Sequence, residues 1–110
     1  QGPVVRANMR PRIELEGGVS WSRLTSTPQE GVEFLLIQYD VGASSGTKMS
    51  HHQGREFTFV LDGELLLELG FDKYLLEAGD SFIFESTTPH RLSNAGSVPM
   101  RAITMIFNQS

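Results

Sequence analysis

Apolar and polar residues alternate in short stretches along almost the whole chain. Ile13 and Leu15 alternate with Glu14 and Glu16, and the same period of two recurs over residues 19–25. This period is typical of strands with one buried face. No stretch keeps the 3.6-residue period of an amphipathic helix. The pattern therefore predicts an all-β fold of roughly nine short strands.

Two stretches, residues 34–41 and 100–107, are apolar at nearly every position. Such a run is expected of a strand that is covered on both faces. One face of each strand must fill the core, and the other needs a cover. The sequence therefore predicts a homodimer that buries the second face.

Turn signals separate the remaining strands, which we expect over residues 74–76, 81–85 and 90–93. Asp62-Gly63 lies between two strand-like runs, residues 56–61 and 64–69, and an Asp-Gly pair in this setting predicts a β-hairpin. Ala78-Gly79-Asp80 predicts a second tight turn. Turns at this spacing favour a β-sandwich or a β-barrel.

The N-terminal segment differs from the rest of the chain. Residues 4–11 lie between Pro3 and Pro11 and are expected to be extended. We therefore divide the chain into a lead-in over residues 1–12 and one β-domain over residues 13–108. Arg6, Arg10 and Arg12 are the only charged residues of the lead-in, and we interpret them as a solvated entry segment.

Charge and composition exclude several classes of function. The 110 residues carry a net charge of −4, which argues against nucleic-acid binding by bulk electrostatics. The chain has no cysteine, which suits a reducing cytoplasm. No apolar run reaches the length of a membrane span.

The candidate chemistry centres on His52, Glu56 and His90. His52 and Glu56 are four residues apart, so a regular strand would point both side chains to one side and His51 to the other. Two imidazoles and one carboxylate could hold one divalent metal ion, either Zn, Fe, Mn or Ni. The same three groups could instead hydrogen-bond one another without an ion. The sequence is compatible with both a metal site and a hydrogen-bonded cluster.

The surrounding motif resembles that of the cupin family. His52, three residues, Glu56, six residues and Gly63 match the second half of the first cupin motif, and Gly79-Asp80 with Pro89-His90 and Asn94 resembles the second motif. Ser50 stands where the family has its first histidine, and Ser44 where it has a glycine. The resemblance implies a double-stranded β-helix, or jelly-roll barrel, in which His52, Glu56 and His90 are the remaining metal ligands.

A narrower resemblance concerns residues 4–11, 18–24, 55–65 and 78–81. These segments are similar to cupin domains that follow a helix-turn-helix domain in bacterial transcriptional regulators. The resemblance implies an effector-sensing and dimerising domain that reaches DNA only through a domain outside this chain. The expected effector site includes His52, Glu56 and His90, with Tyr39 and Arg23 as further ligand contacts. The alternative is a metal-dependent single-domain cupin enzyme of dioxygenase, isomerase or lyase type.

Overall fold

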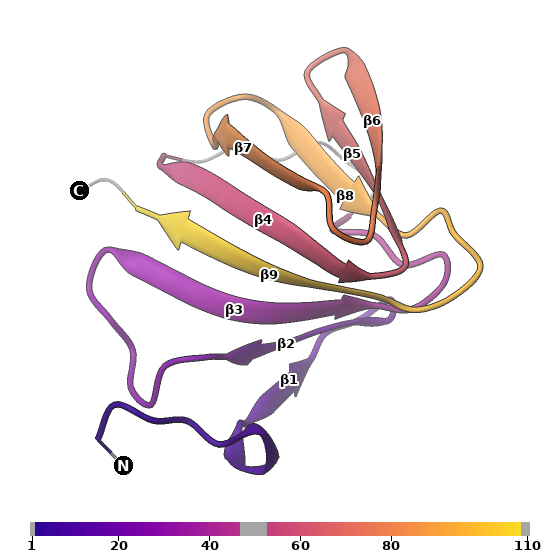
Figure 1. Ribbon diagram of the computed structural model, residues 1–110. Helices are drawn as coiled ribbons and strands as arrows, with labels where there is room; N and C mark the ends of the chain where they lie inside the picture. Colours follow the sequence, from indigo (N-terminus) through magenta and orange to yellow (C-terminus); the bar gives the residue numbers. More distant parts are fainter. Residues whose placement is uncertain (1, 47–52, 109–110) are drawn as a thin grey trace.

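The computed structural model describes residues 2–46 and 53–108, which form nine strands and one 3-10 turn (Figure 1). The elements are η1 (Ala7–Met9), β1 (Arg12–Glu14), β2 (Val19–Arg23), β3 (Val32–Tyr39), β4 (Arg55–Asp62), β5 (Glu64–Leu69), β6 (Asp72–Glu77), β7 (Ser81–Glu85), β8 (His90–Ser93) and β9 (Met100–Phe107).

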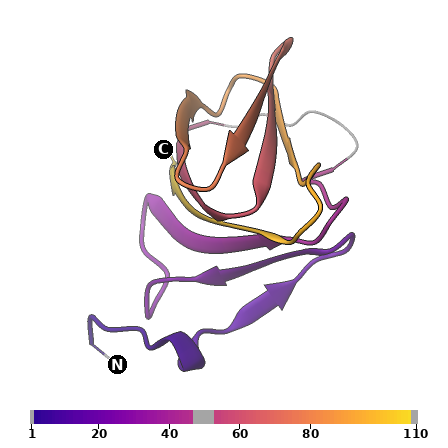
Figure 2. The same ribbon diagram turned by 45° about the vertical axis from the view of Figure 1, so that its right-hand side comes forward.

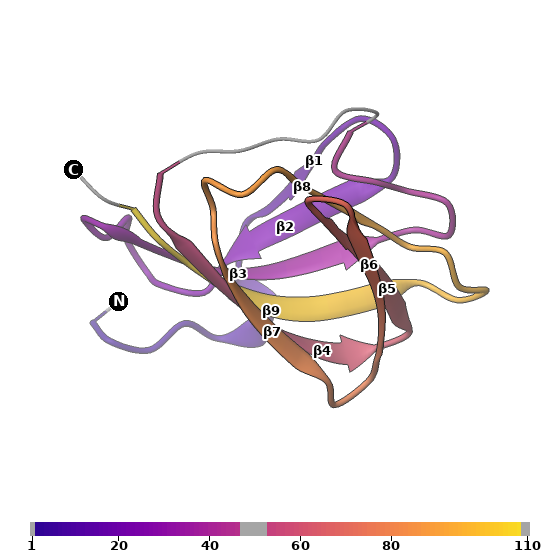
Figure 3. The same ribbon diagram turned by 90° about the horizontal axis from the view of Figure 1, so that it is seen from above.

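The strands form two antiparallel sheets. The large sheet has the order β1-β2-β3-β9-β4-β7 and the small sheet has the order β6-β5-β8. The small sheet closes over one end of the curved large sheet (Figures 2 and 3). The predicted all-β, single-domain jelly-roll architecture is confirmed.

The core lies between the two sheets. Leu35, Ile37 and Tyr39 contribute from β3, and Leu65 and Leu67 contribute from β5; all five side chains are buried. Alternate residues of each strand face this core, which is why the period of two runs through the sequence. The buried face of β9 completes the cluster through Met100 and Ala102.

Several strand predictions are confirmed closely. β8 and β9 begin and end at the predicted residues, and Phe84 is buried while Ile83 is exposed on β7. The expectation that residues 34–41 are covered on both faces is only half met. Leu36 and Gln38, on the outer face of β3, are partly exposed.

The predicted hairpin at Asp62-Gly63 is wrong. β4 pairs with β7 and β9, whereas β5 pairs with β6 and β8, so the chain leaves one sheet for the other at this point. Gly63 has a φ of 77°, and a Cβ atom there would lie 2.7 Å from the carbonyl oxygen of Pro99. Glycine therefore suits this corner, where the chain passes from one sheet to the other and lies close to the backbone of Pro99.

The lead-in is extended on both sides of the η1 turn, at Arg6 and Arg10. It lies along the edge of the large sheet, away from β5 and β6 (Figures 1 and 2). The described part of the chain contains no helix with the length and apolarity that a membrane crossing requires.

Candidate functional site

Glu56 is a buried carboxylate on the inner face of the large sheet. It is the second residue of β4, and the burial pattern of that strand turns Glu56, Thr58 and Val60 toward the interior. Only 5% of Glu56 is exposed. A carboxylate at such a position needs hydrogen-bond or charge partners to offset its lost hydration.

His90 approaches Glu56 from the small sheet. It is the first residue of β8 and is also 5% exposed. Its Nε2 atom lies 3.2 Å from Oε2 of Glu56. Two of the three predicted metal ligands therefore meet inside the barrel, although they are 34 positions apart in the sequence and belong to different sheets.

The other ring nitrogen fixes the protonation pattern of His90. Nδ1 lies 2.8 Å from the carbonyl oxygen of Thr88. A carbonyl oxygen can only accept, so Nδ1 carries a proton and donates it to Thr88. In the neutral ring, Nε2 would then direct a lone pair at the Glu56 carboxylate. A proton or a cation between Nε2 and Oε2 removes this repulsion.

Two further residues that contact this pair were not predicted from the sequence. Ser86, which is fully buried, donates from Oγ to Oε2 of Glu56 over 3.2 Å. The ring of Phe84 lies on the imidazole of His90 with 4.8 Å between ring centroids. The period of two that turns Phe82 and Phe84 inward continues to Ser86, so this signal was present in the sequence.

Opposing effects act on the pKa of His90. Burial is the largest single effect and lowers this pKa, because it disfavours the charged ring. The hydrogen bond with Glu56, the hydrogen bond with Thr88 and the negative charge of Glu56 all raise it. Together they place the pKa of His90 above its ordinary value of 6.5.

Tyr39 belongs to the same interior. It is the last residue of β3 and only 4% of it is exposed. Burial, and secondly the negative charge of Glu56, raise the pKa of Tyr39 to about 12, while a hydrogen bond with Ser45 acts in the opposite direction. The phenol therefore stays neutral at physiological pH and can hydrogen-bond a polar ligand.

The two remaining predicted residues are Arg23 and His52. Arg23 ends β2, and its guanidinium donates to the carbonyl oxygens of Thr25 (3.0 Å) and Ser26 (3.2 Å) in the loop that follows. Its role as a ligand contact stays a prediction. His52, with its neighbour His51, lies outside the described residues.

The donors in the described part of the chain suit a divalent metal ion. His90 offers Nε2 while Nδ1 is held by a backbone carbonyl, an arrangement common among histidine ligands. Two ligands of one tetrahedral ion with bonds of 2.0–2.1 Å are about 3.3 Å apart, close to the 3.2 Å between Nε2 and Oε2. Residues 2–46 and 53–108 contain no cluster of three such donors. The third predicted donor, His52, lies outside these ranges.

Two relatives in sequence are informative. The HTH-type transcriptional regulator PuuR of Escherichia coli is 31% identical over 104 residues, which cover 93% of this chain and 56% of PuuR. The chain thus spans little more than half of that regulator. An uncharacterized protein of Methanocaldococcus jannaschii is 27% identical over 96 residues, which cover 86% of this chain and 77% of that protein.

Solved structures match the fold. An RmlC-like cupin from Shewanella frigidimarina superposes with a TM-score of 0.83 at 18% identity, covering 96% of this chain and 90% of that one. Fe(II) HppE superposes with a TM-score of 0.79 at 24% identity, covering 94% of this chain and 59% of that one. Identities this low support a shared fold and nothing further.

The family model of the cupin domain matches residues 35–106, from β3 to β9. This match covers most of the chain and includes both Glu56 and His90. It agrees with the two-sheet topology and with the motif seen in the sequence. The chain therefore belongs to the cupin domain family.

Proposed function

We propose that this chain is the effector-sensing and dimerising domain of a bacterial transcriptional regulator. The observation that carries the proposal is the buried Glu56–His90 pair. It occurs in a chain that is 31% identical to the regulator PuuR over 104 residues. Burying two ionisable groups contributes little to stability compared with apolar packing. Their retention in the interior is better explained by a ligand that they recognise.

The proposed effector is a small molecule bound inside the barrel near His52, Glu56 and His90, with Tyr39 beside them. Glu56 accepts hydrogen bonds, and the neutral Tyr39 phenol can donate or accept. The mouth of a β-barrel is a common place for such a site. Arg23 is the proposed contact for a carboxylate on the effector.

A homodimer is part of the proposal. Phe59 and Ile83 are about half exposed, and they line one shallow apolar cavity together with Phe57, Ile103 and Met105 on the outer face of β4, β7 and β9. An apolar strand face of this kind is stabilised when a second copy covers it. Effector binding would act through different affinities for two dimer geometries.

DNA contact would come from a domain outside this chain, in the bacterial cytoplasm. Residues 1–12 would be the linker to that domain, and residues 13–108 the cupin barrel. The length of PuuR beyond its match to this chain leaves room for such a domain. The full reading frame tests this part, since a frame that encodes no DNA-binding domain contradicts it.

A thermal-shift screen tests the sensing function. Small acids, amines and amino acids are added to the purified protein, and the unfolding temperature is recorded. A true effector should raise the unfolding temperature of the wild type in a saturable way. It should fail to do so for Glu56→Gln and for His90→Gln, while Glu85→Gln, an exposed change on β7, should respond like the wild type. Equal responses of all four proteins would place the ligand elsewhere and contradict the proposal.

The facing Nε2 and Oε2 atoms also favour a second candidate, a metal-dependent cupin enzyme. His52, Glu56 and His90 would hold a divalent ion, which would polarise or activate a bound substrate or water. Elemental analysis of protein purified without chelator separates the two candidates. Less than about a tenth of an ion per chain, with no gain on adding Fe, Mn, Ni or Zn, excludes the enzyme. If an ion is present, His52→Ala should remove it and His51→Ala should not.

A further inference from the structure

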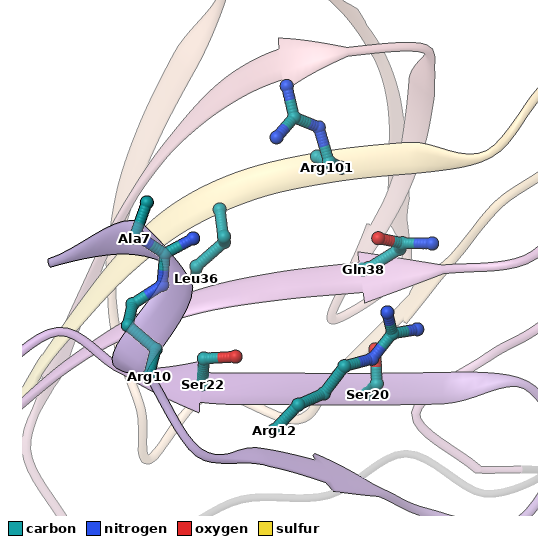
Figure 4. A pocket seen from close by; sticks show the side chains of 8 residues that line it. All are labelled: Ala7, Arg10, Arg12, Ser20, Ser22, Leu36, Gln38 and Arg101. Carbon is teal, nitrogen blue, oxygen red and sulfur yellow. The ribbon is translucent and has the colours of Figure 1, made fainter.

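We propose a second binding site, for a small oxyanion, on the outer face of the large sheet. A cavity of about 230 Å³ lies between the lead-in and the outer face of the sheet, and residues of β2, β3 and β9 line it (Figure 4). Its polar lining consists of Arg10, Arg12, Arg101, Ser20, Ser22 and Gln38. The proposal goes beyond the effector site, which is on the opposite face of the same sheet.

Arg10 gives the strongest indication of a ligand. Its side chain extends from the lead-in over β2 (Figure 4). Its Nε atom is the one buried side-chain nitrogen or oxygen of the described residues that has no hydrogen-bond partner. Leaving a charged donor buried and unpaired is costly. An oxyanion in the cavity would accept this hydrogen bond.

The charge around the cavity is positive. Three arginines line it, and none of the residues that line it is acidic. Two carboxylates lie just outside. Asp62 pairs with Arg101 at 2.5 Å, and Glu14 lies 3.4 Å from Arg12, with both carboxylates largely exposed. Arg10 and Arg12 are therefore the proposed direct contacts, while Arg101 is already held by Asp62.

The floor of the cavity is small and polar. Ser20 and Ser22 are on the outer face of β2 because the pleat turns Val19 and Trp21 inward. Both serines are buried beneath the lead-in. A small side chain at these two positions leaves the space that a ligand would fill, and the hydroxyls with the Gln38 amide can donate to it.

Size and chemistry define the class of ligand. A volume of 230 Å³ corresponds to several water molecules at about 30 Å³ each. It accommodates one carboxylate or phosphate group of a small metabolite, together with some water. Guanidinium groups bind both kinds of oxyanion through two parallel hydrogen bonds. The bound anion would hold the lead-in, through Arg10 and Arg12, against the barrel.

Isothermal titration calorimetry at low ionic strength tests the site, with inorganic phosphate and citrate as separate probes of the whole, chelator-treated chain. We expect saturable binding of at least one probe, and the tighter one identifies phosphate or carboxylate as the preferred group. Arg10→Gln should weaken binding about tenfold or more, since it removes charge-assisted hydrogen bonds. Arg12→Gln should weaken it in the same direction.

Arg6→Gln is the matched control, because it removes the same charge from the same segment. Arg6 itself lines a different cavity. Its affinity should stay within about twofold of the wild type, as expected for an exposed charge outside the site. Equal loss of affinity in Arg6→Gln and Arg10→Gln would indicate bulk electrostatic attraction and overturn the proposal. The absence of saturable binding of either probe would overturn it as well.

His90→Gln separates this site from the interior one. It should bind the anion normally, and loss of binding would place the anion in the barrel and overturn the proposal.

Discussion

At the scale of single residues, the main feature of the barrel interior is the set of groups that offset the lost hydration of the buried Glu56 carboxylate. Its Oε2 atom receives a hydrogen bond from Ser86 and faces Nε2 of His90. The negative charge of Glu56 also reaches Tyr39 and contributes to the raised pKa of its phenol. One carboxylate thus influences groups from two different strands, β3 and β8, and from the loop after β7.

The raised pKa of Tyr39 predicts a pH dependence of stability. The folded-state pKa of about 12 exceeds the ordinary value of 10.0, so the neutral phenol stabilises the fold below pH 10. This contribution is lost as the pH rises from 10 towards 12. Between pH 9 and pH 11, the free energy of unfolding should fall by about 1 kcal/mol more in the wild type than in Tyr39→Phe. Urea unfolding at the two pH values measures the difference. Parallel loss in both proteins would contradict the burial and charge effects at Tyr39.

At the scale of secondary-structure elements, the corners between the sheets determine where the site forms. β4 carries Glu56 in the large sheet, and the chain then switches to the small sheet at Gly63 and returns after β6. β8 can therefore pair with β5 and bring His90 over the inner face of the large sheet. A true hairpin at Asp62-Gly63 would have kept β5 beside β4 in one sheet.

Substitution of Gly63 tests this corner. Gly63→Ala adds a Cβ atom 2.7 Å from the Pro99 carbonyl oxygen at a φ of 77°. It should lower the free energy of unfolding by more than about 1 kcal/mol through strain and overlap. Gly70→Ala is the matched control, since its φ is 60° but no atom lies within 4 Å of the added Cβ. Equal effects in chemical unfolding would mean that the close approach to Pro99 contributes nothing.

The strands themselves were predictable from sequence, but their partners were not. The alternation around Phe82, Ile83 and Phe84 fixes which side chains are inward, because it reflects local pleating. Strand pairing depends on contacts far apart in the chain, and an Asp-Gly pair is compatible with a hairpin or with a sheet-switching corner. The Glu56–His90 contact was anticipated only because the spacing resembled a known motif. Ser86 was missed because the alternation of residues 81–85 was not extended past Glu85, although the period of two continues to Ser86.

At the scale of the whole molecule, the two faces of the large sheet differ in the side chains that they carry. The inner face carries the Glu56–His90 pair, and the outer face carries an apolar region around Ile83 and a cationic cavity around Arg10. The apolar region is the proposed dimer contact. The cavity is on the same outer face but near the opposite edge of the sheet, between the lead-in and β2, β3 and β9 (Figure 4).

The proposed dimer predicts a specific effect of charge on the outer face. Ile83→Glu places a carboxylate in the apolar region and should shift the protein from dimer to monomer, because a buried unpaired charge is costly. Sedimentation velocity over a range of protein concentrations measures the change. Phe71→Glu alters an exposed aromatic residue in the β5–β6 turn and should leave the dimer intact. A wild type that is monomeric throughout, or an Ile83→Glu variant that stays dimeric, would contradict the proposed interface.

The most direct test of the account follows the ring nitrogens of the three histidines by nitrogen-15 NMR. The spectra are recorded while the strongest stabilising compound or metal ion from the thermal-shift screen is added. His90 should show a protonated Nδ1 throughout, as its hydrogen bond to Thr88 requires, and the Nε2 signal of His90 should move together with the signals of His52. His51 should not respond, and Glu56→Gln should abolish both shifts. Signals of His52 and His90 that respond independently, or that ignore a ligand which stabilises the protein, would contradict a shared interior site.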